Sequence, residues 1–306
     1  MSWQVFLMQA LNGVQLGLLL FLLSAGLTLV LGIMSFLNLA HGSFYMMGAY
    51  FAAALYGWTG SFLVAAVVAI PATLLLGLLV ERIVLFRLYD RDHLYQVLAT
   101  FGLILFFNEL VRILWGSSSI YMGTPELLTG SIQILGLPYP KYRFAVICVG
   151  LLVALVLYWI IHRTRIGMLI RAGASNATMV GMLGVNIKRI NMLVLGFGAG
   201  LAGVAGLMSA PIMSVQPGMG EPILILTLVV IVTGGIGSIR GAFYGALIVG
   251  FVDTIGRAFL PWILRELLDR DLAQALGPAI ASIAIYLFMA VVLAIKPEGL
   301  FQVKHG

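Results

Sequence analysis

The stretch VFLMQALNGVQLGLLLFLLSAGLTLVLGI, residues 5–33, determines the class of fold. It contains no Asp, Glu, Lys or Arg, and none occurs anywhere from Met1 to Val80. In a helix, roughly 20 apolar residues cross a bilayer core about 30 Å thick. The stretch has no basic leading segment and is longer than the apolar part of a secretory signal, so we expect an uncleaved membrane span.

The whole composition is that of a membrane protein. Of the 306 residues, 62% are hydrophobic and 9% are charged, which is more apolar surface than a soluble domain could bury. The net charge of +6 fits basic cytoplasmic loops beside anionic lipid, which we favour over nucleic-acid binding. A single cysteine, Cys148, excludes an intrachain disulfide, and no Cys or His spacing indicates a metal site.

Nine charge-poor segments have about the length of a membrane helix. They are residues 5–33, 36–57, 61–80, 95–115, 142–161, 190–211, 222–239, 242–260 and 275–295. Gly, Ser, Asn and Pro crowd two breaks, near Gly42 and Gly237, and such breaks are tolerated only where protein buries them or they line a cavity. We therefore expect an all-α, polytopic integral membrane protein with a single transmembrane domain over residues 1–306. It has nine membrane helices, or eight if a segment beside a break is re-entrant.

The basic residues predict the orientation. They gather in residues 81–93, in residues 162–189, and after the last segment at Lys296 and Lys304. The positive-inside rule places these regions in the cytoplasm, so residues 116–141 and 211–222 face outward. Nine crossings put the N-terminus outside. With eight crossings its side is open, because residues 1–80 hold no Lys or Arg.

An internal repeat is visible. Residues 25–35 read AGLTLVLGIMS and residues 199–209 read AGLAGVAGLMS, with seven identities in eleven positions. A Gly-Ser pair follows each copy, at Gly42 and at Gly237, with different spacing. On the nine-helix topology the copies run in opposite directions, the inverted-repeat pattern of many transporters. Two Gly/Ala-rich membrane helices could also look alike by composition alone.

Residues 196–206 contain five glycines. Small residues allow helix backbones to approach closely in lipid. This run therefore predicts a tight helix contact, either within the chain or with a second subunit.

The residues at the two breaks are candidates for a translocation pathway. They are Asn38, His41, Gly42 and Ser43 at the first break and Gly235, Gly237 and Ser238 at the second. Polar side chains at membrane depth usually face protein or water, so either a broken helix lining a pathway or a polar interfacial turn fits the first break. No second ligand or nucleophile is spaced to give His41 a metal or catalytic role. The run GGIGSIRG, residues 234–241, lacks the Lys-Ser/Thr ending of a P-loop and fits a tight turn.

Two acidic residues, Glu109 and Asp253, lie inside apolar segments. A charged side chain at the centre of a membrane helix costs about 2.5–3.5 kcal/mol on insertion scales, so each acid is expected to have a partner. Arg112 follows Glu109 by three residues and Arg257 follows Asp253 by four, one helical turn in each case. We expect structural ion pairs rather than a proton relay.

Residues 162–189 carry five Lys or Arg and no Asp or Glu. Polar and apolar residues alternate at helical spacing between Arg171 and Leu183, and Gly184 and Asn186 suit a helix end. This amphipathic helix either lies on anionic lipid or fits a groove of a cytoplasmic protein.

Several motifs in combination carry a family resemblance. They are the long run at residues 12–50 with its NLAHG element, Glu81-Arg82, RIGMLIRAGASNATMVGMLGVN at residues 165–186, GGIGSIRGA at residues 234–242 and KPEGLF at residues 296–301. Over nearly its whole length the chain resembles the permease subunits of the branched-chain amino-acid family of bacterial ABC importers.

The resemblance implies partners and a role for the cytoplasmic loop. Such permeases pair as two related subunits above two cytoplasmic ATPases, and a periplasmic solute-binding protein delivers the solute. The residues that match the ATPase-coupling segment are Arg165, Gly167, Arg171, Ala172, Asn176, Gly184, Val185 and Asn186. Ser175 and Asn176 stand where many members have an acidic residue, which puts an ion pair with the ATPase in doubt but not the docking. The partners would use ATP, so this chain is not an enzyme and binds no cofactor.

The implied function is passage of branched-chain or related amino acids through the bacterial inner membrane by alternating access. The family is similar to importers of urea, amides and aromatic acids, so these are alternative solutes. A self-sufficient channel or ion-coupled carrier is the alternative class. The repeat and the two acids within apolar segments support it.

Overall fold

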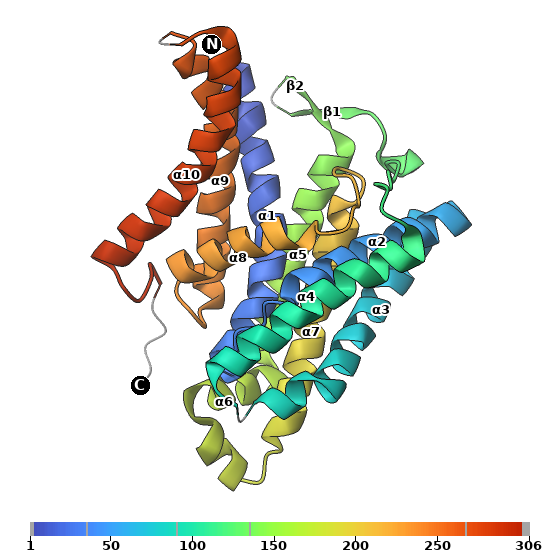
Figure 1. The fold of residues 1–306 in the computed structure, drawn as a ribbon, viewed down its shortest axis with the longest axis vertical. Helices are drawn as coiled ribbons and strands as arrows, with labels where there is room; N and C mark the ends of the chain where they lie inside the picture. The colour runs from blue at the N-terminus through green and yellow to red at the C-terminus, as the bar shows by residue number, and fades with distance from the viewer. Residues whose placement is uncertain (1–2, 35, 90, 135, 267, 302–306) are drawn as a thin grey trace.

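The computed structural model describes residues 3–34, 36–89, 91–134, 136–266 and 268–301. The helices are α1 (Trp3–Met34), α2 (His41–Thr59), α3 (Phe62–Ile83), α4 (His93–Trp115), α5 (Lys141–Arg163), α6 (Arg165–Met182), α7 (Ile187–Ser209), α8 (Gly220–Gly234), α9 (Ile239–Leu264) and α10 (Arg270–Ile295). The short elements are the 3-10 turns η1 (Leu85–Leu88) and η2 (Glu126–Leu128) and the strands β1 (Ser131–Ile134) and β2 (Leu137–Pro140), which form an antiparallel hairpin. Figure 1 shows their arrangement.

Each of the nine segments expected to be a membrane helix coincides with a helix, but residues 36–40 and 235–238, at the ends of two expected segments, are not helical. Within the residues that the structure describes, seven helices are long and apolar enough to cross a membrane: α1, α3, α4, α5, α7, α9 and α10. The other two, α2 and α8, border the breaks near Gly42 and Gly237, and α8 has only 15 residues, fewer than the roughly 20 that span a bilayer core. The all-α, multi-pass architecture is confirmed. The choice between eight and nine crossings stays a prediction.

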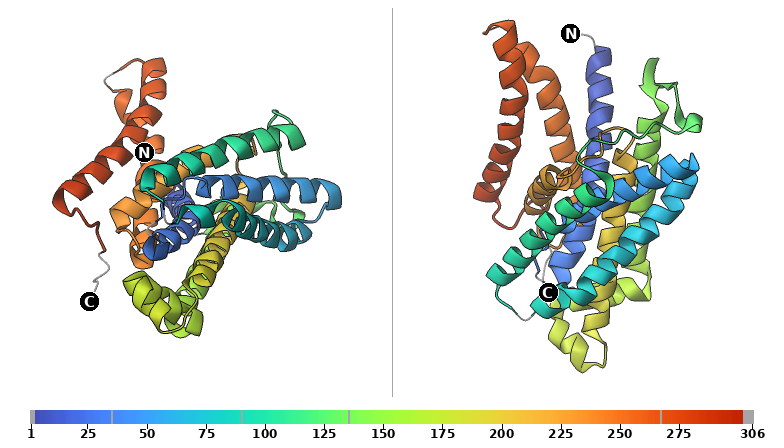
Figure 2. Two further views of the ribbon diagram at one scale, coloured as in Figure 1. Left: turned by 60° about the horizontal axis from the view of Figure 1, so that its bottom comes forward. Right: turned by 45° about the vertical axis from the view of Figure 1, so that its right-hand side comes forward.

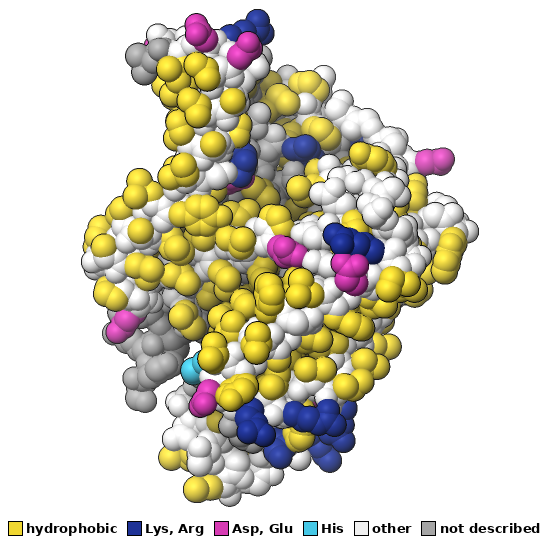
Figure 3. Space-filling view, viewed as in Figure 1, with side chains coloured by type: hydrophobic (Ala, Val, Ile, Leu, Met, Phe, Trp, Pro, Cys, Tyr) yellow, Lys and Arg dark blue, Asp and Glu magenta, His cyan; other side chains and the backbone are white. Residues whose placement is uncertain are grey.

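The two ends of the bundle differ in charge. The loop helix α6 lies at the lower end, whereas the N-terminal end of α1 and the β1–β2 hairpin lie at the upper end (Figure 1). A dense group of Lys and Arg side chains also occupies the lower end (Figure 3). Figure 2 shows α9 and α10 as a hairpin at one side of the remaining helices. Lys304, one of the residues expected in the cytoplasm, lies outside the described residues.

Helix α1 forms the centre of the bundle and is buried without interruption over residues 17–30. Its glycines bring it close to two other helices: Gly13 and Gly17 lie against the backbone of α9, and Gly26 lies against Gly198 of α7. Helices in lipid associate through such packing, because the surrounding acyl chains are as apolar as the side chains.

Helix α7 uses the glycines predicted to make a tight contact. Gly198 touches α1, Gly203 touches Gly48 of α2, and Gly206 touches Tyr45 of α2. Gly196 lies against Leu78 of α3. The predicted tight contact is confirmed, and its partners are three helices of the same chain.

The two copies of the repeat lie in the C-terminal parts of α1 and α7. These helices approach each other at Gly26, in the first copy, and Gly198, the residue before the second copy. Ser35, the last residue of the first copy, lies outside the described residues. Gly42 lies at the start of α2, directly after the first copy, whereas all of α8 separates the second copy from Gly237. The two Gly-Ser pairs therefore occupy different structural positions relative to the repeat copies that precede them. An inverted relation between the halves stays a prediction.

Replacing Gly206 by Ala is expected to destabilise the bundle, because the added Cβ would overlap the carbonyl oxygen of Tyr45. Overpacking of this kind costs roughly 1–3 kcal/mol, which would lower the midpoint of thermal denaturation in detergent. Gly102→Ala in α4 is the matched control, because no other side chain or neighbouring helix lies within 4 Å of its Cβ position. Equal stability of the two variants would contradict the role assigned to Gly206.

Candidate coupling and translocation sites

The loop expected to form a cytoplasmic helix is α6. Thr164 precedes it, and its Oγ1 accepts a hydrogen bond from the Gly167 N–H at 3.1 Å, which caps the helix N-terminus. A Cβ on residue 167 would overlap the carbonyl oxygens of Ile160 and Ile161 in α5, so glycine is required there. Helix α6 therefore leaves α5 through a tight corner that only a small residue permits.

Helix α6 is bent at Asn176. This residue has φ −156° and ψ 91°, outside the helical region, and its Oδ1 accepts a hydrogen bond from the Met179 N–H at 2.9 Å. Asn side chains readily form such local caps in place of regular helix bonds. The continuous helix expected between Arg171 and Leu183 is therefore wrong in this detail, because two short helices meet at Asn176. Arg165, Arg171 and Asn176 are exposed, and Ala172 is half-buried.

The end of α6 leads directly into α7. Gly184 adopts the left-handed conformation with φ 86°, and the Val185 N–H donates to the Val180 carbonyl oxygen at 3.3 Å. Asn186 then caps α7, because its Oδ1 accepts from the Arg189 N–H at 3.2 Å. The helix end predicted at Gly184 and Asn186 is confirmed, and a short capped turn joins the two helices.

The tip of α6 presents large apolar side chains to the surroundings. Met179, Met182 and Leu183 are 60%, 83% and 78% exposed. A contiguous exposed apolar patch beside polar residues is typical of an interaction site. The tip is thus the part of the loop best suited to fit a partner or the bilayer surface.

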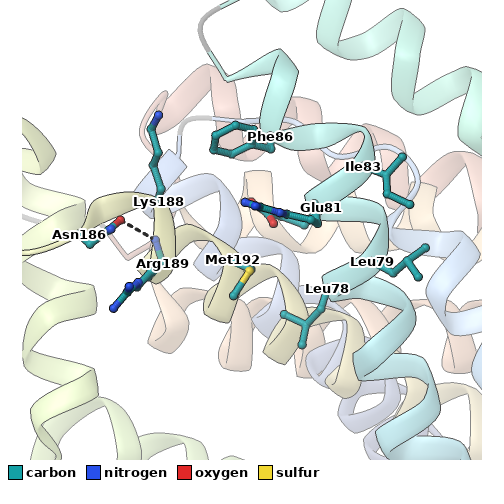
Figure 4. A pocket seen from close by; sticks show the side chains of 10 residues that line it. Leu78, Leu79, Glu81, Ile83, Phe86, Asn186, Lys188, Arg189 and Met192 are labelled. Carbon is teal, nitrogen blue, oxygen red and sulfur yellow. Dashed lines mark hydrogen bonds between the residues drawn. The ribbon is translucent and has the colours of Figure 1, made fainter.

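A cleft of about 790 Å³ opens next to this loop, between the end of α3 and the start of α7 (Figure 4). Its lining residues are Leu78, Leu79, Glu81, Arg82, Ile83, Phe86, Asn186, Lys188, Arg189 and Met192. Arg82 and Lys188 lie 5.9 and 4.9 Å from the centroid of the Phe86 ring, within the range of cation–π attraction. The cleft is therefore basic with apolar walls.

The side chain of Glu81 ties the connection between α3 and α4 to the end of α3. Its side chain is buried and accepts a hydrogen bond from the Tyr89 hydroxyl at 2.8 Å. Burial, together with this bond to the acid, raises the pKa of Tyr89 well above its usual range, so the hydroxyl stays a donor. In the sequence, Glu81 was identified only as part of the family motif Glu81-Arg82. No pattern of spacing predicted its contact with Tyr89.

The first break is buried in protein, as irregular backbone at membrane depth requires. The Oδ1 of Asn38 accepts from the Ala40 N–H at 3.1 Å, and the Nε2 of His41 lies 3.1 Å from the Leu23 carbonyl oxygen of α1. Both side chains are buried. Gly42 packs directly against Gly220 at the start of α8. His41 thus satisfies a backbone carbonyl of α1.

The second break is the predicted tight turn. Gly235 and Gly237 have φ of 107° and 80°, in the region that favours glycine. Ser238 caps α9 by accepting from the Gly241 N–H at 3.0 Å. The turn between α8 and α9 therefore depends on residue types that the GGIGS sequence supplies.

The C-terminal motif KPEGLF covers this turn. The N–H groups of Leu300 and Phe301 donate to the carbonyl oxygens of Thr233 and Gly234 at 2.9 and 3.0 Å. These two carbonyls end α8 and would otherwise lack partners. The GGIGSIRGA and KPEGLF motifs, far apart in the sequence, thus form one structural unit.

The residues of the two breaks have different neighbours. Gly42 and Ser43 border a crevice too tight to hold a water molecule, together with Asn108 of α4 and Glu221 of α8, whereas Gly237 lies against Gly32 of α1. Sequence reasoning did not mark Glu221, which meets Asn108 across 113 positions of the chain. Within the described ranges, no three His, Cys, Asp or Glu side chains form a group that could hold a metal ion.

Both acids within apolar segments have the arginine partners expected from spacing. Glu109 lies 2.7 Å from Arg112, and Asp253 lies 2.7 Å from Arg257. Arg257 also donates to Ser282 of α10 at 2.9 Å, so this pair connects α9 with α10. The predicted ion pairs are confirmed.

Comparison with known proteins places the chain in a family. Residues 9–295 match the family described as branched-chain amino acid transport system / permease component. The chain is 32% identical to the high-affinity branched-chain amino acid transport system permease protein LivH of Escherichia coli (strain K12), over 83% of this chain and 87% of that protein. It is 28% identical to the corresponding protein BraD of Pseudomonas aeruginosa, over 96% and 95% of the two chains. It is also 28% identical to the ribose import permease protein RbsC of E. coli K12, over 76% and 73%. The chain therefore belongs to the family of permease components of branched-chain amino acid transport systems.

Proposed function

We propose that this protein is the permease subunit of an ATP-driven importer in the bacterial inner membrane. It forms, with a second related permease, the path for branched-chain or related amino acids that a periplasmic binding protein delivers. Two cytoplasmic ATPase subunits bind and hydrolyse ATP, so the chain needs no cofactor of its own. The observation that carries the proposal is the family match over residues 9–295, which includes α6 at the basic end of the bundle.

The proposed coupling runs from α6 into the bundle. The residues assigned to ATPase docking are Arg165, Gly167, Arg171, Ala172, Asn176, Gly184, Val185 and Asn186. Gly167 and Asn186 support this role by closing the corners to α5 and α7. Because α7 packs tightly on α1, α2 and α3, a displacement of α6 is passed to the centre of the bundle. The tight packing therefore favours a mechanism of alternating access in which α6 moves the bundle, rather than one in which α6 moves independently of it.

The proposed translocation region comprises the residues at the two breaks. They are Asn38, His41, Gly42 and Ser43, with Gly235, Gly237 and Ser238. Gly42 and Ser43 support this proposal by lying where the start of α2 meets the start of α8. Gly235, Gly237 and Ser238 contribute by forming the turn that positions α8 against α9.

Two alternatives differ in testable ways. Urea, amides or aromatic acids are alternative solutes for the same kind of importer. A channel or ion-coupled carrier would work without ATPase subunits, and it would require a titrating acid such as Asp253.

Uptake in proteoliposomes holding both permeases, the ATPases and the binding protein is expected to require ATP hydrolysis. ATP is supplied on the side of the vesicle membrane that carries the ATPase subunits. We expect uptake of radiolabelled leucine with ATP and none with a non-hydrolysable ATP analogue. Competition by urea, amides or aromatic acids identifies the solute class. Equal uptake by this chain alone, driven by an ion gradient without ATP, would establish the carrier instead.

Introducing charge at the tip of α6 is expected to uncouple the ATPases. Met182→Glu with Leu183→Glu places two carboxylates on a surface that must fit an apolar groove, and should weaken co-purification of ATPase subunits by roughly tenfold or more. Leu127→Glu is the matched control, because this leucine is 92% exposed in the segment expected outside. If the ATPase subunits co-purify with the α6 variant as well as with the wild type, the tip of α6 does not bind them.

Asp253→Asn is expected to leave ATP-driven uptake close to wild type. The amide oxygen can still accept from Arg257, so the link between α9 and α10 persists. Initial uptake rates measured across a pH series check this. Loss of transport with intact assembly would favour ion coupling through this acid.

A further inference from the structure

The cleft between the end of α3 and the start of α7 brings three cationic side chains together. Arg82 lies in the last turn of α3, and Lys188 and Arg189 lie in the first turn of α7. All three are exposed. Figure 4 shows Lys188 and Arg189 on the α7 side of the cleft, opposite the side chains of α3. Two helices far apart in the sequence thus place their basic residues at one opening.

The acids of the chain leave this positive charge uncompensated. In the described part of the chain, no acidic side chain lies within ion-pair distance of Arg82, Lys188 or Arg189. Glu81, which also lines the cleft, is buried and accepts the hydrogen bond from the Tyr89 hydroxyl. The N-terminal end of α7 adds a partial positive charge of its own. The opening therefore favours an anion.

Phe86 brings the cations of the two helices close to each other. The Lys188 ammonium and the Arg82 guanidinium lie 4.9 and 5.9 Å from the centroid of its ring. Like charges held beside one ring repel each other. An anion bound between α3 and α7 would offset this repulsion and connect the two helix ends.

The walls of the cleft beyond the charges are apolar. Leu78 and Leu79 lie one turn before Arg82 on α3, and Met192 lies one turn after Lys188 on α7. Leu79 is 55% exposed, so the cleft opens onto the apolar outer face of α3.

This order of groups matches the order of groups in one leaflet of a bilayer. Helices α3 and α7 are both long and apolar enough to cross a membrane, so their ends lie near its surface and the walls of the cleft lie in its hydrocarbon. Basic pockets between membrane helices on the cytoplasmic side bind anionic lipid head groups. An acid of a soluble partner could reach the three cations, but an acyl chain also suits the apolar walls that continue toward the middle of the bilayer.

We propose that this cleft binds an anionic glycerophospholipid of the cytoplasmic leaflet. Its phosphate lies among Arg82, Lys188 and Arg189, where guanidinium groups donate in pairs to phosphate oxygens and the ammonium group supplies a point charge. An acyl chain lies along Leu79 and Met192. The cleft volume of about 790 Å³ is within the range of small-molecule sites, roughly 300–1,000 Å³. The inference depends on the basic end facing the cytoplasm, and not on the solute or on ATP.

Lipid titration of the full chain in mild detergent, followed by native mass spectrometry, tests the proposal. Phosphatidylglycerol and phosphatidylethanolamine with the same acyl chains are compared, because only the first has a net negative charge. We expect phosphatidylglycerol to bind roughly tenfold more tightly. The triple variant Arg82→Gln with Lys188→Gln and Arg189→Gln is expected to lose this preference. An unchanged preference in the triple variant would overturn the proposal.

The matched control removes three charges at the same end of the bundle. Arg163, Arg165 and Arg171 are exposed and do not line the cleft. Their triple replacement by Gln is expected to keep the preference for phosphatidylglycerol. If this control loses the preference as fully as the cleft variant does, the attraction is general to the basic end and no specific site exists.

Thermal denaturation provides a second readout on variants that fold. Phosphatidylglycerol is expected to raise the midpoint of the wild type, because the lipid joins the ends of α3 and α7, and to raise that of the triple variant much less. The single variant Lys188→Gln changes one exposed side chain and is expected to weaken phosphatidylglycerol binding by roughly fivefold. Wild-type affinity in Lys188→Gln, with equal midpoint shifts in all variants, would contradict the assigned site.

Two other occupants give different results. Inorganic phosphate has no acyl chain, so we expect it neither to displace phosphatidylglycerol nor to raise the midpoint. If it acts as well as the lipid, the cleft is a site for soluble anions. If the triple variant keeps its lipid preference but no longer co-purifies with the ATPase subunits, the cleft is a protein contact. Either result would overturn the lipid site and leave the proposed function intact, because none of these measurements involves transport.

Discussion

Close backbone contact between α7 and its neighbours is the constraint on which the other features depend. Glycines at positions 198, 203 and 206 bring α7 against α1 and α2 at distances that a side chain would prevent. In lipid this packing supplies the association that burial of apolar surface supplies in water. The centre of the bundle is therefore a set of helices held together by backbone contact.

The loop helix α6 is joined to this packed core at both of its ends. Asn186 caps α7 directly after the turn at Gly184, and Gly167 closes the corner to α5. The bend at Asn176 separates the anchored part of α6 from its exposed tip. In the proposed coupling, a partner that binds the tip acts on the bundle centre through this bend and the two capped corners.

Lipid as the surrounding medium accounts for the contrast between faces. Apolar side chains cover the outer surfaces of α3 and α5, whereas the first break is enclosed by α1 and α8. The exposed ion pair of α4, Glu109 with Arg112, lies in the last two turns of that helix, beside the segment expected outside. In the pair of α9, the Asp253 carboxylate is buried, whereas the Arg257 side chain is 45% exposed and donates to Ser282 of α10.

Composition and local spacing were enough to predict the membrane class, the helical segments, the basic end, the turn at Gly235–Ser238 and the pairs Glu109–Arg112 and Asp253–Arg257. All of these depend on residues within a few positions of each other. The bend at Asn176 was missed, because helical periodicity does not reveal when an Asn side chain replaces a helix bond. Only the folded chain brings Asn108 to Glu221, KPEGLF to the end of α8, and Gly203 to Gly48. Contacts between distant segments arise from how helices pack, and a single sequence carries no local signal for that.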